Sequence, residues 1–458
     1  MKRLLFCLVV LIAVLALVMP ASATEVKISG IYNAKAYARD NFDGYDDNDD
    51  STQFVTQRMR MYFNIIASEN LKLVYKNEID MEWGDSAGSA ASRNSGGGAG
   101  GDAVNLETKN VYLEFMVPDA PVKATLGLQG VALHKGWFVD DDLAGARFDM
   151  NFDPVSITAY WMGLAGLEAD DQTASGTVSN DASDDWWQLV ASGAYKAENL
   201  DARLSFAYER RPNDTTSADQ PESDDLYMVM GELGMSFDMV SFTVLAATNF
   251  GETKSDFNAQ DQDYSGYLFK GDVAFALDMA TIRLMAVYAS GDDEDGYDSN
   301  GDGVKDTVAR GEDDFQMLKG RTAVTAEIIS DGYSYDRNAN LTQIGGANSP
   351  SNMYLLNAGV DLKPTDTTTL KFDVYYIGMV EKRTIGGDEE DEIGIEIDAR
   401  LTQKIYDNLS LTLLGCYLFA EDGYGRYDTD AGTAGIQPGD AGSGDDAFQV
   451  GLGVDYKW

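Results

Sequence analysis

The sequence contains very little cysteine, histidine or basic charge. It has two cysteines and one histidine, and 34 Lys and Arg residues stand against 76 Asp and Glu, which gives a formal net charge of −42. With so few thiols and imidazoles, neither a disulfide framework nor a zinc or haem site is expected, and no cofactor should be required. The strong negative charge also excludes nucleic acid as a partner.

Long apolar runs are absent too, except at the N-terminus. Two basic residues there precede an apolar run that ends at Met19, followed by Pro20 and the small triplet Ala21–Ala23. This pattern is typical of a cleavable signal peptide and predicts one over residues 1–23. Further along, no apolar window is long enough for a membrane helix, so the sequence leaves a secreted soluble protein and a transmembrane β-barrel open.

The rest of the chain alternates apolar and polar residues. Between Phe448 and Trp458 apolar side chains occupy every even position, and the same period recurs in residues 71–83, 200–209 and 393–402. Because successive side chains of a strand point to opposite faces, each of these segments predicts a strand with one apolar face. A soluble β-sandwich would show the same alternation, so the connections between strands have to decide.

Very short connections alternate with long polar ones. The predicted long connections are 40–52, 84–103, 166–184, 211–224, 251–263, 291–352, 382–391 and 421–446. Outer-membrane barrels have short periplasmic turns and long extracellular loops. We therefore predict an all-β protein, a transmembrane antiparallel up-and-down β-barrel over residues 24–458. The expected number of strands is about eighteen, and sixteen stays open because residues 315–352 are ambiguous.

The charged residues of the strands are candidates for the pore lining. Arg58 and Arg60 share one face of a predicted strand, opposite three apolar side chains. A charge that faces lipid costs roughly 2–4 kcal/mol in a barrel, so both arginines should face the lumen. By the same test Lys76, Glu78 and Arg147 face the lumen. These residues form either structural ion pairs or the electrostatic filter of a channel.

The acidic segment 291–352, predicted to be an extracellular loop, contains a candidate calcium site. Its residues Asp298, Asn300, Asp302 and Asp306 occupy positions 1, 3, 5 and 9 of a loop with glycine at position 6, as in an EF-hand. The closing carboxylate is missing, since position 12 is Ala309. The alternative is an acidic surface that is simply solvated.

Several motifs resemble bacterial outer-membrane porins. Residues Gln57–Tyr62 and Glu78–Gly84 resemble the second and third strands of these proteins. Val104–Leu113, followed by Gly127–Gly130, is similar to the homotrimeric porins of sulfate-reducing and related deltaproteobacteria. The terminal strand ending at Trp458 resembles the recognition signal of the barrel-assembly machinery. The likeness covers residues 24–165 and 446–458.

This resemblance implies a homotrimer of barrels and an inward-folded constriction loop. The loop after the fifth strand is Val131–Leu143, and it carries Asp140, Asp141 and Asp142. Folded inward, these aspartates would face Arg58, Arg60 and Arg147 across the aperture.

The expected function is that of a general diffusion porin for small hydrophilic solutes and ions in a Gram-negative outer membrane. Outer-membrane lipid and lipopolysaccharide would surround it. One alternative is a solute-specific channel of about eighteen strands, which a lumenal ladder of aromatic residues would favour; the other is a structural or adhesive surface barrel. Enzymatic activity is not expected, because His134 is the sole histidine and no serine lies in a nucleophile elbow.

Overall fold

The computed structural model describes residues 24–42, 51–84, 97–99, 106–165, 171–172, 178–179, 186–211, 223–254, 262–292, 313–316, 318, 325–329, 350–385, 388–424 and 445–458. None of the helices within these residues is long and apolar enough to cross a membrane.

The described chain is almost entirely β-strand. The strands of the main sheet are β1 (Glu25–Asp40), β2 (Thr52–Ser68), β3 (Leu71–Glu82), β4 (Glu107–Met116), β5 (Val122–Leu133), β6 (Val139–Phe152), β7 (Val155–Ala165), β10 (Trp186–Ala197), β11 (Leu200–Arg211), β12 (Ser223–Phe237), β13 (Val240–Lys254), β14 (Gln262–Tyr264), β15 (Tyr267–Ala276), β16 (Ala280–Ala289), β17 (Met353–Thr365), β18 (Thr368–Ile385), β19 (Asp388–Tyr406), β20 (Leu409–Ala420) and β21 (Ala447–Lys457). Two-residue strands β8 (Asp171–Gln172) and β9 (Val178–Ser179) pair separately, and the 3-10 turns η1 (His134–Gly136) and η3 (Asp422–Tyr424) complete the described elements.

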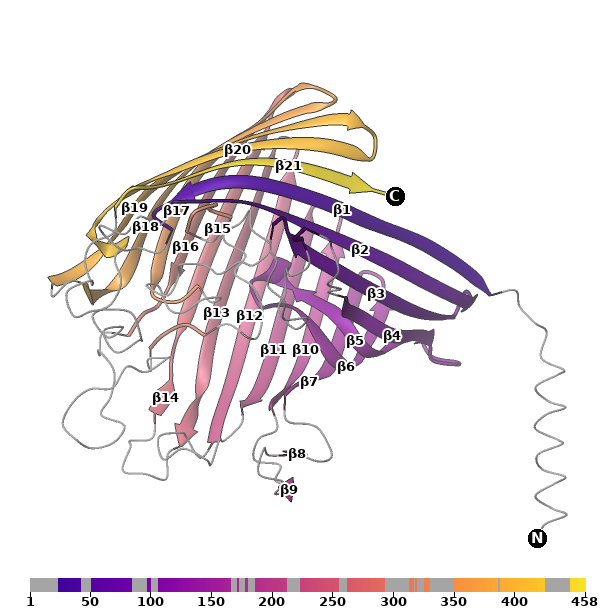
Figure 1. The fold of residues 1–458 in the computed structure, drawn as a ribbon. Helices are drawn as coiled ribbons and strands as arrows, with labels where there is room; N and C mark the ends of the chain where they lie inside the picture. Colours follow the sequence, from indigo (N-terminus) through magenta and orange to yellow (C-terminus); the bar gives the residue numbers. More distant parts are fainter. Residues whose placement is uncertain are drawn as a thin grey trace, which may run out of the picture.

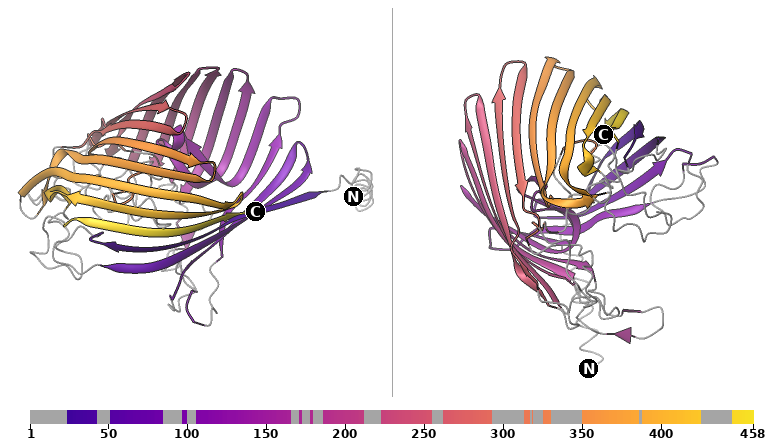
Figure 2. Two further views of the ribbon diagram at one scale, coloured as in Figure 1. Left: turned by 90° about the horizontal axis from the view of Figure 1, so that it is seen from above. Right: turned by 90° about the vertical axis from the view of Figure 1, so that its left-hand side faces the viewer.

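These strands close into one antiparallel barrel (Figures 1 and 2). Apart from the short β14, each strand of the main sheet pairs with the next one of that sheet along the chain, and β1 pairs with β21 from Ile31–Lys457 to Asp40–Phe448. The short β14 pairs with β13 just beyond β15, so the two count as one crossing and the chain crosses eighteen times. The prediction of eighteen strands is confirmed. The ambiguous segment adds no strand in its described residues, 315, 316, 318, 325–329 and 350–352.

Short turns lie at one end of the barrel, where β1 begins and β21 ends. The long connections leave from the other end (Figure 1). We call these the turn end and the loop end. The predicted connection 382–391 is wrong, because β18 runs to Ile385, β19 begins at Asp388, and Arg383 pairs with Glu390. Five consecutive acidic residues suggested a loop, but backbone pairing tolerates them where a strand extends beyond the apolar part of the wall.

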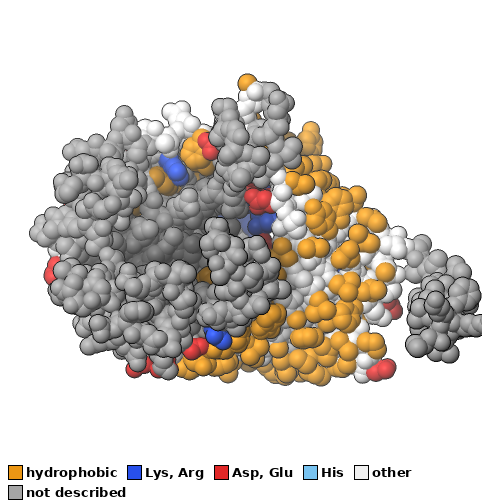
Figure 3. Space-filling view, turned by 60° about the horizontal axis from the view of Figure 1, so that its bottom comes forward, with side chains coloured by type: hydrophobic (Ala, Val, Ile, Leu, Met, Phe, Trp, Pro, Cys, Tyr) orange, Lys and Arg blue, Asp and Glu red, His pale blue; other side chains and the backbone are white. Residues whose placement is uncertain are grey.

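The two faces of the barrel wall have different chemistry. Large apolar side chains such as Leu204, Phe269 and Leu452 are exposed on the outer face, whereas the side chains between them point inward and are polar or packed. The orange apolar surface of the outer wall and the charged side chains at the hollowed end are visible in Figure 3. This division follows from the two-residue period of the sequence.

Aromatic side chains line both edges of the apolar outer wall. Near the loop end the rings of Tyr208 and Tyr227 lie 4.9 Å apart and those of Tyr227 and Phe250 lie 5.3 Å apart, both stacked. Near the turn end, Phe237 and Phe242 stack at 6.2 Å. On β12 Tyr227 and Phe237 lie ten positions apart, which matches the roughly 9–11 residues of a membrane-spanning strand.

Candidate functional site

The candidate site is a ladder of ion pairs on the lumenal face of β2 and β3. Arg58 is paired in register with Asp80, and Arg60 with Glu78. The Arg58 guanidinium donates to Asp80 through Nε at 2.7 Å and Nη2 at 2.5 Å, and its Nε lies 3.3 Å from Glu78 Oε2. Arg60 donates to Glu78 as well. The alternation rule thus brings the predicted residues Arg58, Arg60 and Glu78 together.

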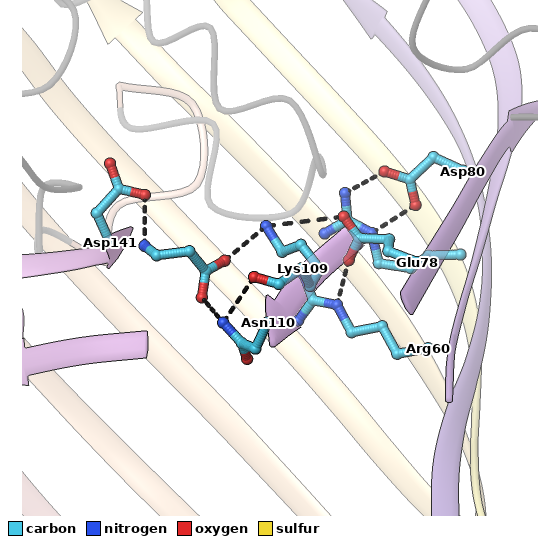
Figure 4. Close-up of polar contacts among 8 residues, drawn as sticks. Arg60, Glu78, Asp80, Lys109, Asn110 and Asp141 are labelled. Atoms are coloured by element: carbon cyan, nitrogen blue, oxygen red, sulfur yellow. Dashed lines mark hydrogen bonds and ion pairs between the residues drawn. The ribbon is translucent and has the colours of Figure 1, made fainter. Parts of the chain in front are cut away.

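Lys109 of β4 extends this ladder to β6 (Figure 4). Its Nζ lies 3.8 Å from Glu78 Oε1 and 2.9 Å from Asp142 Oδ2, while Asn110 donates to Asp142 Oδ1 at 2.8 Å. Sequence reasoning missed Lys109, because strict alternation would place it on the outer face with Val111. The pairing of β3 and β4 shifts register next to Asn110, and such an irregularity lets two consecutive residues reach the same side.

The predicted opposition to the arginines across an aperture is wrong for Asp142. Asp142 is joined to Arg58 and Arg60 through Lys109 and Glu78, so these charges form one continuous chain. Asp141 accepts a hydrogen bond from the backbone N–H of Asp142 at 2.8 Å. Because side chains alternate along β6, Asp140 shares a face with Asp142.

Arg147 belongs to a second cluster, nearer the turn end. It donates to Asp149 at 2.9 Å, Lys123 lies 3.7 Å from Asp149 and 3.6 Å from Glu114, and Lys72 lies 2.9 Å from Glu114. Lys76, also predicted for the constriction, lies opposite Tyr62 with its Nζ 5.1 Å from the ring centre.

The predicted constriction segment Val131–Leu143 is the end of the β5–β6 hairpin, with η1 at its tip, and this tip lies against lumenal residues of distant strands. His134 Nδ1 is 3.1 Å from Glu232 of β12, and its Nε2 is 2.8 Å from Ser205 of β11. Lys135 pairs with Glu232 at 3.2 Å. Since Glu232 and Ser205 lie well inside their strands, the tip extends into the barrel. The alternating residues Val131, Leu133, Val139 and Leu143 are buried in the apolar cluster of the interior.

Parts of the predicted loop 291–352 also lie against the lumenal wall. Asn249 of β13 exchanges hydrogen bonds with the backbone of Gln316, at 2.7 and 2.8 Å. Residues Thr325–Ile329 contact β18 and β19, at Tyr375, Glu396, Asp398 and Arg400. Nothing in the sequence pattern predicted these contacts, because they join segments about 50–70 residues apart that carry no common period.

The calcium candidates Asp298, Asn300, Asp302 and Asp306 lie outside the described residues. Within those residues no group of three or more His, Cys, Asp or Glu side chains is arranged to hold a metal ion.

Glu232, His134 and Ser205 follow one another as in a catalytic triad, but the serine is not placed to react. Ser205 is only 1% exposed and its hydroxyl is 2.8 Å from that of Ser192. A nucleophile needs access to a substrate carbonyl. The three residues instead fasten the hairpin tip to the wall, in either proton state of the imidazole, because both hydroxyls can donate or accept.

An eighteen-strand barrel with an apolar outer wall, two aromatic belts and a charged lumen defines a transmembrane β-barrel with the porin fold. No protein-family model and no curated protein matches the chain. Solved structures do. The outer membrane protein OpdK from Pseudomonas aeruginosa is 9% identical, with a TM-score of 0.53 over 94% of this chain and 99% of that one. OccK2 (OpdF) of the same species is 12% identical, with a TM-score of 0.55 over 94% and 97% of the two chains.

A crystal structure of OpdK with vanillate gives a TM-score of 0.54 at 9% identity, over 94% of this chain and 98% of that chain. At such low identity these similarities show the fold. The narrower resemblance to deltaproteobacterial homotrimeric porins stays a prediction.

Proposed function

We propose that the protein is an outer-membrane porin, a passive channel through which small hydrophilic solutes and ions diffuse without chemical change. The observation that carries this proposal is the ion-pair ladder of Arg58, Arg60, Glu78, Lys109 and Asp142 on the inner wall of a barrel whose outer wall is apolar. Only a polar interior gives charged strand residues a favourable environment within a membrane.

A second candidate, a solute-specific channel, is supported by the segments that lie against the lumenal wall. The β5–β6 tip and residues 325–329 are each fastened by several polar contacts, which favours a narrow path. Aromatic residues beside lumenal charges, such as Tyr62 next to Lys76, meet the criterion for a solute-specific channel in part.

Conductance measurements separate these functions. The purified protein would be inserted into planar bilayers for single-channel currents and reversal potentials, and into liposomes for swelling in sugars of increasing size. A general porin admits every sugar below one size limit. A solute-specific channel shows current block that saturates with one solute class, and vanillate belongs in the panel because it is present in a similar crystal structure. A structural or adhesive barrel would carry no current.

The predicted homotrimer and the location in the outer membrane belong to the same proposal. Light scattering in mild detergent, together with electrophoresis of unheated samples, would give three times the barrel mass for a trimer. A single barrel mass in both assays contradicts the trimer and leaves the channel proposal standing.

A further inference from the structure

Residues Thr325–Ile329, which we call the inner strap, are held by a carboxylate of the barrel wall. Glu396 of β19 is fully buried, and its two oxygens accept hydrogen bonds from the backbone N–H groups of Ile328 at 2.7 Å and Ile329 at 3.1 Å. Each oxygen of the Glu396 side chain therefore has one backbone N–H of the strap as its donor. The side chain thus binds the backbone of the strap and does not depend on the identity of its residues.

Three further contacts fasten the strap to the same wall. The backbone N–H of Glu327 donates to Asp398 at 3.2 Å, its side chain pairs with Arg400, and the hydroxyls of Thr325 and Tyr375 lie 3.0 Å apart. Glu396, Asp398 and Arg400 alternate along the lumenal face of β19, over a length of about 13 Å. The strap therefore lies along the inner face of β19, at positions in the middle of that strand.

The strap and the wall satisfy each other's polar groups. Irregular backbone at membrane depth is tolerated only where it is buried in protein or lines a water-filled cavity, and Glu396 gives two of the N–H groups of the strap acceptors. In turn, a fully buried carboxylate needs donors, which the strap provides. On the strap, Ala326 and Ile328 are fully buried, so it is packed as well as hydrogen-bonded.

We propose that the inner strap is a second constriction of the channel and that Glu396 is the positioning residue that keeps it against the wall. This inference rests on the proposed channel function. It adds that the inner strap narrows the solute path on the side of the barrel formed by β18 and β19. Release of the strap from this wall widens the path.

The test is Glu396→Gln in planar bilayers and in the liposome assay. Glutamine has nearly the volume of glutamate, but its NH₂ group is a donor, so one N–H of the strap loses its acceptor. The expected result is a second, larger conductance level in single-channel records and passage of larger sugars than the wild type admits.

Asp373→Asn is the matched control, because it makes the same change of a carboxyl group to an amide on the lumenal face of the neighbouring strand β18. Asp373 bonds to Arg283 at 2.9 Å and to Asn357 at 3.1 Å, and none of the contacts described for the strap involves it. Any effect on the channel of replacing a lumenal carboxyl group by an amide appears in this variant too. Thr325→Val removes the hydroxyl contact with Tyr375 without leaving a buried charge unpaired, and it should shift conductance in the same direction as Glu396→Gln, by less.

The outcomes are separable. If the wild type carries no current and passes no sugar, the channel function itself fails. If the wild type conducts and both Glu396→Gln and Thr325→Val match Asp373→Asn in conductance and sugar size, the strap is not a constriction and this inference is overturned. Should Glu396→Gln fail to assemble, shown by loss of the heat-modifiable barrel band, Thr325→Val decides alone.

Discussion

Opposite changes of selectivity are expected when the two partners of one lumenal ion pair are neutralised separately. Arg58→Gln leaves the carboxylates of Asp80 and Glu78 in excess by one charge, whereas Asp80→Asn leaves the guanidinium in excess. The first variant should move the reversal potential toward cation selectivity and the second toward anion selectivity. The double variant Arg58→Gln/Asp80→Asn restores the balance and should return close to the wild type.

The expected size follows from Coulomb's law. A unit charge about 4 Å from a permeating ion changes its energy by about 1 kcal/mol in a water-like dielectric, which is about fivefold in local ion concentration. Stability should change as well. Arg58, Glu78 and Asp80 are 5%, 0% and 1% exposed, and removing one partner of such a buried pair costs about 3–5 kcal/mol. The double variant should recover most of this loss, because no charge is left unpaired.

Arg147→Gln is the matched control, because it neutralises an arginine in the more exposed lumenal cluster. The side chains of Arg147 and its neighbour Lys123 are 25% and 40% exposed, against 5% for Arg58. The Debye length falls from about 8 Å at 0.15 M salt to about 3 Å at 1 M, and buried charges are screened less. The selectivity change of Arg147→Gln should therefore vanish at 1 M salt, while that of Arg58→Gln persists.

The measurements for all these variants are reversal potentials in a salt gradient and urea midpoints of the refolded barrels. Shifts of equal sign in Arg58→Gln and Asp80→Asn, or none in either, would refute the placement of this pair on the ion path.

Three other predictions concern closure, the hairpin tip and calcium. Gly30→Val should prevent stable closure, because a Cβ at Gly30 would lie 2.3 Å from the Trp458 ring, whereas Gly193→Val, where a Cβ meets nothing within 4 Å, should assemble normally; the heat-modifiable band on gels reports both. His134→Ala should raise the exclusion limit in liposome swelling by releasing the β5–β6 tip, and an unchanged limit would show that the tip does not narrow the path. Calorimetry should detect weak calcium binding, at about 10⁻⁴–10⁻³ M, that Asp302→Ala removes; identical heats for both proteins would rule that site out.

Alternation, together with the pattern of short and long connections, predicted the barrel, and alternation identified part of the candidate site. A strand in a membrane must turn one face to lipid, so the two-residue period identifies the inward side chains. Arg58 and Glu78 lie on the two strands of one hairpin, and their approach follows from pairing across a short turn. The sequence alone therefore predicts that Arg58 and Arg60 face the lumen, and no contact between distant segments is needed for this prediction.

Other parts of the site could not be predicted, for three physical reasons. Lys109 depends on a register irregularity, which shifts a side chain to the other face without a sequence marker. His134 and the strap depend on contacts between segments about 70–100 residues apart, which leave no periodic trace in the chain. The acidic start of β19 resembles a loop in sequence because loops are often rich in charge, whereas the backbone hydrogen bonds of a sheet form irrespective of side-chain charge.

Two kinds of lumenal residue follow from this distinction. The outer wall excludes charge, so every ionisable side chain of a membrane-spanning strand segment must face inward, where neighbours on adjacent strands lie about 4.5–5.5 Å apart. Opposite charges at that spacing form ion pairs, as Arg58 does with Asp80 and Arg60 with Glu78, and the barrel requires such pairs whatever passes through it. The barrel wall does not need the β5–β6 tip or the inner strap in the same way. Because a closed barrel satisfies its backbone hydrogen bonds without these two segments, we assign the proposed narrowing of the path to their polar anchors at His134 and Glu396.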